Sequence, residues 1–142
     1  MSGRPAPSRR TLLRGAAVTP VAGLGLAACS SGGGDASPSA TPTAPVTLGA
    51  DSEVAKGAAK LYEDQNVVVS RAEDGTLKAF SSICTHAQCA INTLRGTTLV
   101  CPCHGSEFDA TTGKVVRSPA TEPLHPLQVE SKNGKIVAGP GA

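Results

Sequence analysis

Cysteine and histidine are concentrated in one short stretch of this chain. Four of the five cysteines and two of the three histidines lie within 21 residues. They form two groups that are separated by eleven residues: Cys84, His86 and Cys89, then Cys101, Cys103 and His104. Thiolate and imidazole together are ligands for zinc and iron. The stretch therefore predicts a metal site that the fold must assemble from two loops.

The rest of the composition makes such a site important for stability. The 142 residues suit one domain with a tail. They include only three aromatic residues, Tyr62, Phe80 and Phe108, and no tryptophan. A domain with so few large apolar side chains needs disulfides or a metal to stabilise it.

Charge is unevenly distributed along the chain. Lys and Arg outnumber Asp and Glu by 13 to 11, but four arginines precede the first acidic residue, Asp35. After them the balance is 9 basic residues (13 − 4) against 11 acidic ones. A net charge this small argues against a nucleic-acid partner.

Residues 1–28 have the layout of an export signal. A basic part runs to Arg14, and an uncharged part rich in small residues follows up to Ala28. Its fourteen residues, at about 1.5 Å each, give a helix of roughly 21 Å, which is shorter than the ~30 Å hydrocarbon core of a bilayer. We therefore expect a signal peptide and not a membrane-spanning anchor. Residues 8–14, Ser-Arg-Arg-Thr-Leu-Leu-Arg, resemble a twin-arginine signal.

Lipid attachment is expected at Cys29. The sequence Leu-Ala-Ala-Cys that ends at this residue is similar to a bacterial lipobox. The alternative is ordinary cleavage after Ala28, which would leave a free thiol. The following Gly/Ser/Pro/Thr-rich residues cannot form a core, so 29–45 are assigned to the lipidated cysteine and a flexible linker. Sixteen flexible residues have an r.m.s. reach of about 5–6 Å × √16, or roughly 22 Å.

Residues 46–142 predict an all-β domain. Two hairpins are expected from alternating or β-branched runs around turn residues: 67–71 with 77–80, and 127–130 with 135–137. Shorter segments are also expected to be regular: strands at 46–48, 97–100 and 114–116, and a turn or two of helix at 55–62. The cysteines and histidines fall in a long insertion between Phe80 and Lys114.

Two kinds of metal site are compatible with the ligands. Cys84, His86, Cys101 and His104 could form a tetrahedral zinc site. Zinc motifs, however, usually place two cysteines in one pair and two histidines in the other. Here each loop supplies one of each, which suits a binuclear site where the cysteines hold one metal and the histidines hold the other.

The pattern C-x-H, fourteen residues, C-x-x-H resembles the Rieske 2Fe-2S motif. The resemblance covers roughly residues 46–137, and the run from Cys101 to Ser106 is its most specific part. Cys89 and Cys103, in equivalent places in the two loops, match the disulfide-bearing branch of the family. That branch includes the Rieske subunit of quinol–cytochrome c reductase, and its disulfide requires the oxidising compartment to which an export signal leads.

The resemblance implies a fold and a role for each ligand. The fold would be small antiparallel β-sheets or a barrel, with an inserted two-loop subdomain that binds the cluster. Cys84 and Cys101 would bind the inner iron, and His86 and His104 would bind the outer iron with their rings facing solvent. Imidazole ligation raises the reduction potential of such a cluster to between ~−150 and +300 mV.

The resemblance also implies tuning residues around the cluster. Ser106 matches a serine whose hydroxyl donates to a cluster sulfide and raises the potential. Phe108 stands where high-potential members carry a tyrosine, so one hydrogen-bond donor is lost and we expect a lower potential. Ala87 and Gln88 stand where reductase subunits usually carry Leu-Gly. The small Ala87 covers the cluster less, so the resemblance does not extend to the docking of quinol. Residues 118–123 resemble the proline-rich loop that packs over the cluster.

Together these features predict a protein that transfers one electron at a time. It would be exported and held by its lipid at the outer face of a bacterial cytoplasmic membrane, with a redox protein or membrane quinol as partner. Three alternatives are a Rieske subunit of a cytochrome bc1-type reductase, a small Rieske subunit of an exported molybdenum-type oxidoreductase, and a zinc-stabilised lipoprotein binding module. The sequence suggests no independent catalytic site, and His125, outside the motif, is expected to be structural or solvated.

Overall fold

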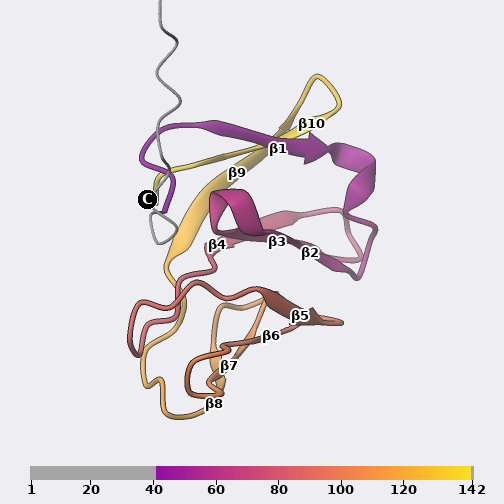
Figure 1. The fold of residues 1–142 in the computed structure, drawn as a ribbon. Helices are drawn as coiled ribbons and strands as arrows, with labels where there is room; N and C mark the ends of the chain where they lie inside the picture. Colours follow the sequence, from indigo (N-terminus) through magenta and orange to yellow (C-terminus); the bar gives the residue numbers. More distant parts are fainter. Residues whose placement is uncertain (1–40, 142) are drawn as a thin grey trace, which may run out of the picture. The chain divides into compact units, whose positions relative to one another are not determined.

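The computed structural model describes residues 41–141, so the predicted signal, Cys29 and most of the predicted linker lie outside the described residues. Within this part the strands form two antiparallel sheets (Figure 1). The six-stranded sheet has the order β1-β10-β9-β4-β3-β2, with β1 (Val46–Ala50), β2 (Ala59–Tyr62), β3 (Val67–Arg71), β4 (Leu77–Ser81), β9 (Pro126–Lys132) and β10 (Lys135–Gly139). The four-stranded sheet has the order β5-β6-β7-β8, with β5 (Thr93–Arg95), β6 (Thr98–Val100), β7 (Glu107–Asp109) and β8 (Val115–Arg117).

Both predicted hairpins are present. β3 pairs with β4, and β9 pairs with β10. Asn133 and Gly134, between β9 and β10, both have positive φ (53° and 74°), as a primed two-residue turn requires. The shorter strands predicted at the start of the domain, within the insertion and directly after it are also confirmed, with ends shifted by one or two residues.

The predicted helix at 55–62 is wrong, because its last four residues form strand β2. Tyr62 pairs with Val67, and Ala59 pairs with Ser70. Leu61 packs against one hydrophobic cluster and Tyr62 lies in another, which is the two-residue period of a strand. A short run of this kind does not distinguish helix from strand by its sequence. Its pairing with β3 therefore decides the structure.

The six-stranded sheet is covered on both faces at strand β3. Val67, Val68 and Val69 of β3 all have 0% exposure. Val68 belongs to the hydrophobic cluster that includes the four-stranded sheet, and Val67 and Val69 belong to a second cluster, which is formed mainly by strands of the six-stranded sheet itself. This explains why β3 is continuously apolar and not alternating.

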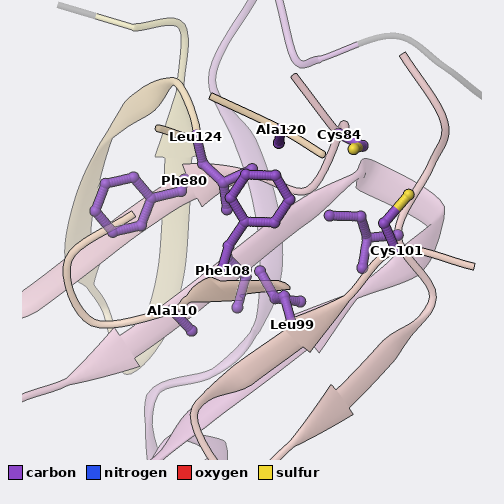
Figure 2. Close-up of a cluster of buried hydrophobic side chains, with 10 residues drawn as sticks. Phe80, Cys84, Leu99, Cys101, Phe108, Ala110, Ala120 and Leu124 are labelled. Carbon is purple, nitrogen blue, oxygen red and sulfur yellow. The ribbon is translucent and has the colours of Figure 1, made fainter. Parts of the chain in front are cut away.

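The first of these clusters connects the insertion to the rest of the domain (Figure 2). Phe80 of β4 packs there with Leu99 and Phe108 from the four-stranded sheet, and with Ala120 and Leu124 from the segment that follows it. The insertion thus contributes a small sheet, and not only a pair of loops, to a core that it shares with the six-stranded sheet. Residues 41–141 contain no helix that is long and apolar enough to cross a bilayer.

Replacing Gly113 with alanine is expected to destabilise the domain by about 3 kcal/mol. Gly113 has φ of +73°, and an added Cβ would lie 2.6 Å from Cε1 of Phe80. A left-handed conformation costs a non-glycine residue about 1–2 kcal/mol, and overpacking adds about 1–3 kcal/mol. Gly134→Ala is the control, because Gly134 has a similar φ and no atom within 4 Å of the added Cβ. Equal losses in urea unfolding for both variants would contradict the predicted contact with Phe80.

Candidate metal centre

The two loops that carry the predicted ligands share one backbone pattern. In each loop the N–H of the first cysteine donates to the carbonyl five residues later, and the N–H four residues later donates back to that cysteine's carbonyl. The four bonds are Cys84 N to Cys89 O (2.8 Å), Gln88 N to Cys84 O (2.9 Å), Cys101 N to Ser106 O (2.8 Å) and Gly105 N to Cys101 O (3.1 Å). The donors Gln88 and Gly105 both have positive φ, of 57° and 76°. The two loops are therefore the same structural unit, used twice.

A disulfide joins Cys89 of the first loop to Cys103 of the second, as predicted. The expectation that these two cysteines occupy equivalent places in their loops was wrong. The shared hydrogen-bond pattern equates Cys89 with Ser106, and Cys103 with His86. The loops meet with these different positions in contact, which the spacing in the sequence does not reveal.

The four predicted ligands are divided between the interior and the surface. Cys84 and Cys101 are free thiols with 1% and 2% exposure, and both lie at the same side of the hydrophobic cluster (Figure 2). His86 and His104 are exposed, and their ring centroids are 4.9 Å apart in an edge-to-face arrangement. Both kinds of ligand thus come in pairs, with the sulfur pair inside and the imidazole pair outside.

Burial and hydrogen bonds act in opposite directions on the Cys101 sulfur. Burial raises the pKa of this thiol, and contact with the Cys84 thiol also raises it. The backbone N–H groups of Cys103 and His104 point at the sulfur and lower the pKa. Such donors stabilise negative charge on the sulfur, and a coordinated metal deprotonates a thiol outright. The second loop is thus suited to hold a metal-bound thiolate.

The segment 118–124 is attached to both loops. Thr85 Oγ1 donates to the carbonyl of Glu122 (2.7 Å), and the N–H of Ala120 donates to Ser106 Oγ (3.0 Å). The segment therefore packs against the site, as the resemblance to a proline-rich loop implied. The sequence did not predict that Thr85 and Ala120 form the hydrogen bonds that attach this segment. Thr85 could have been noticed inside the first motif, but Ala120 acts through its backbone and leaves no signal in the sequence.

The two predicted tuning residues are both fully buried. Ser106 and Phe108 each have 0% exposure. Because the Ser106 oxygen accepts a hydrogen bond from Ala120, its own proton remains free to donate to another acceptor. Phe108 lies in β7 opposite Leu99. The remaining histidine, His125, is exposed, which is the second of the two expected settings, structural or solvated.

Ser106→Ala is expected to have two measurable effects. It leaves the N–H of Ala120 unpaired in the interior, which costs about 1–3 kcal/mol of stability. It also removes the hydroxyl that the resemblance pairs with a cluster sulfide, and the reduction potential is expected to fall by at most roughly 60–130 mV, the one-electron equivalent of a whole bond of about 1.5–3 kcal/mol. Ser82→Ala is the control, because Ser82 is also fully buried and its hydroxyl has no partner. Voltammetry and urea unfolding that show the same values for both variants would contradict the role of Ser106.

Comparison with known families identifies the site. The sequence profile of the Rieske [2Fe-2S] domain matches residues 44–138. The chain belongs to the Rieske family. Among curated relatives, the cytochrome b6-f complex iron-sulfur subunit of Chlorobaculum tepidum is 35% identical over 95 residues, which cover 65% of this chain and 51% of that protein. A putative Rieske subunit of respiratory nitrate reductase from Haloferax mediterranei is 42% identical over 64 residues, or 43% of this chain and 29% of that protein. The chain thus spans about half the length, or less, of these relatives.

Two solved structures are similar to this domain over nearly their whole length. A plasma membrane Rieske protein from the cyanobacterium Synechocystis PCC 6803 has a TM-score of 0.53 and 32% identity, and the match covers 66% of this chain and 97% of that one. A chain from the oxygenase–ferredoxin complex of carbazole 1,9a-dioxygenase has the same TM-score with 28% identity, and the match covers 70% of this chain and 97% of that one.

The residues of the site fit the cofactor of this family, a 2Fe-2S cluster. Two buried thiols in contact, backbone donors aimed at one of them, and two neighbouring imidazoles form a mixed sulfur and nitrogen donor set. The sulfurs of Cys89 and Cys103 are bonded to each other and are not available as ligands. The family assignment confirms the expected 2Fe-2S cluster over the zinc alternative.

Proposed function

We propose that this protein is an exported, membrane-tethered carrier that passes single electrons between a donor and an acceptor. The observation that carries the proposal is the division of ligands, with the Cys84 and Cys101 thiols buried and the His86 and His104 rings exposed. A cluster held in this way would have its imidazole edge at the surface, where a partner can approach.

The residues have separate roles in this proposal. Cys84 and Cys101 would hold the inner iron in the interior, and His86 and His104 would hold the outer iron and form the path to the partner. The 2Fe-2S cluster supplies reversible one-electron chemistry, with a potential that its imidazole ligands raise. The ring nitrogens of His86 and His104 that do not bind metal can release a proton as the positive charge at the site increases. The disulfide and the segment 118–124 keep the two loops in place.

The proposed location rests on the sequence before the domain. The twin-arginine-like residues 8–14 and the lipobox-like residues 26–29 support export and lipid attachment, and a linker of the composition proposed up to residue 45 would let the domain move. Similarity to cytochrome b6-f subunits favours a second candidate, a Rieske subunit of a quinol-oxidising reductase complex. Similarity to the putative nitrate reductase subunit favours a third, the small subunit of an exported oxidoreductase.

Electron paramagnetic resonance of the reduced protein tests the proposal. We expect a rhombic signal with an average g near ~1.9, from a cluster with mixed Cys and His ligation, together with two iron and two sulfide per chain, as the 2Fe-2S formula requires. Reduction by ascorbate would support quinol as the donor, and a need for dithionite would point to a donor of lower potential. Absence of the signal from protein that contains zinc would refute electron transfer.

Phe108→Tyr is expected to raise the reduction potential, by tens of millivolts to about 100 mV for one added hydrogen bond. The residue lies in β7, close behind the second ligand loop, and is fully buried in the cluster that contains Cys84 and Cys101. Phe80→Tyr is the control, because Phe80 belongs to the same cluster but lies on the side away from the cysteine sulfurs (Figure 2). If protein-film voltammetry finds no upward shift in Phe108→Tyr, the absence of a tyrosine hydroxyl at position 108 does not lower the reduction potential.

A further inference from the structure

The sulfur of Cys101 lies close to the disulfide as well as to its fellow ligand. It is within 4.8 Å of the sulfurs of both Cys89 and Cys103, and it contacts the Cys84 thiol. Cys101 is thus a free thiol beside an intact disulfide in the same protein. A thiol in that position is a nucleophile for thiol–disulfide exchange.

We propose that in the cluster-free protein Cys101 attacks the neighbouring disulfide at Cys89, so that the folded domain rearranges into a form that cannot take up a cluster. The Cys101 thiol gives up its proton to solvent and its sulfur forms a bond with Sγ of Cys89, the Cys89–Cys103 bond breaks, and Cys103 leaves as a thiolate that takes up a proton from solvent. One disulfide and one thiol are present before and after the step, so no external oxidant or reductant is needed.

The surroundings of the two disulfide sulfurs select Cys89 as the one attacked. Cys103 is exposed, whereas Cys89 is half-buried, so solvent stabilises the negative charge better on a departing Cys103. The opposite attack would join Cys101 to Cys103 across the single residue Pro102. Two cysteines so close in sequence cannot easily reach unstrained disulfide geometry.

Exchange would compete with assembly of the metal centre. After it, Cys101 is held in a disulfide with Cys89, so one of the two sulfur ligands is missing. Uncatalysed rearrangement takes minutes to hours, so the cluster must be inserted before the disulfide forms or soon afterwards. The exchange itself depends only on the positions of the sulfurs, but this consequence for loading depends on the proposed role of Cys101 as a ligand.

Differential alkylation of the full chain tests the proposal. The chain is prepared without iron, incubated with its disulfide intact, and treated with one alkylating reagent, then reduced and treated with a second. Mass spectrometry with peptide fragmentation assigns the first label to individual cysteines. With the protein unfolded at the first treatment so that buried thiols react, we expect that label, among the four loop cysteines, on Cys84 and Cys101 in fresh protein and increasingly on Cys84 and Cys103 with time, together with a matching loss of iron binding on reconstitution. The cluster-loaded protein is expected to show no label on Cys103.

Two variants that each lack one ligand thiol separate the exchange from general opening of the site. In Cys84→Ser the nucleophile remains, so Cys103 is expected to acquire about tenfold more of the first label than in Cys101→Ser. Equal labelling of Cys103 in both variants, or no labelling in either, would overturn the proposal. Circular dichroism confirms that the two variants are folded to the same extent. Iron and sulfide analysis of fresh wild-type protein tests the proposed function independently of the exchange.

Discussion

A variant in which alanine replaces His104 is expected to lose nearly all of its cluster. His104 is exposed beside His86, and these two rings are the only imidazoles in the two ligand loops. Even residues that merely support a metal ligand contribute 10–100-fold to metal affinity, so loss of a ligand is expected to cost at least about 100-fold. Iron content, visible absorbance and the paramagnetic signal should all decrease together.

His125→Ala is the matched control for this experiment. His125 is also exposed, but it lies outside both ligand loops, directly before β9. It should keep two iron per chain, the content of a 2Fe-2S cluster. A His104→Ala protein that binds as much iron as His125→Ala would show that the imidazole pair is not part of the metal centre.

Removing the disulfide is expected to destabilise the domain by about 3 kcal/mol, the chain-entropy value for a closed loop of about 15 residues. Cys89 and Cys103 lie 14 positions apart in the sequence and join the two ligand loops directly. The double variant Cys89→Ser/Cys103→Ser is preferable to a single substitution, because it leaves no unpaired thiol beside the site. The loss should appear as a lower midpoint in urea unfolding and as faster release of iron.

Reduced wild-type protein provides the control for the double variant. Both lack the cross-link, so their unfolding midpoints should agree, and oxidised wild type should be more stable than either. If the double variant is as stable as the oxidised protein and retains its iron equally well, the disulfide does not hold the loops together.

Much of the site could be predicted from the sequence because its ligands are close together along the chain. Cys84 and His86, and likewise Cys101 and His104, are separated by only one or two residues. Each loop is closed by its own local hydrogen bonds, so the spacing within a motif almost determines the local geometry. Hairpin turns such as Asn133-Gly134 were predictable for the same reason, since their residues select one backbone conformation.

Other features could not be predicted because they depend on partners distant in the sequence. β2 was expected to be helical, and only its pairing with β3 makes it a strand. β5 and β7 are three-residue strands, too short to carry a periodic signal, and β6 holds them together by pairing on both sides. The hydrogen bond between Ser106 and Ala120 uses the backbone N–H of Ala120, which any residue except proline could supply.

The sequence by itself therefore determined the family, the pair of ligand motifs and the all-β class, because each depends on residue types at short spacing. Tertiary structure alone decided that two loops with the same backbone pattern meet at non-equivalent positions, with Cys89 against Cys103. It also decided that the thiols are buried and the imidazoles exposed, and that the Cys101 sulfur lies within 4.8 Å of the disulfide sulfurs. These features arise from packing between segments that are far apart in the chain, and residue spacing carries no information about that packing.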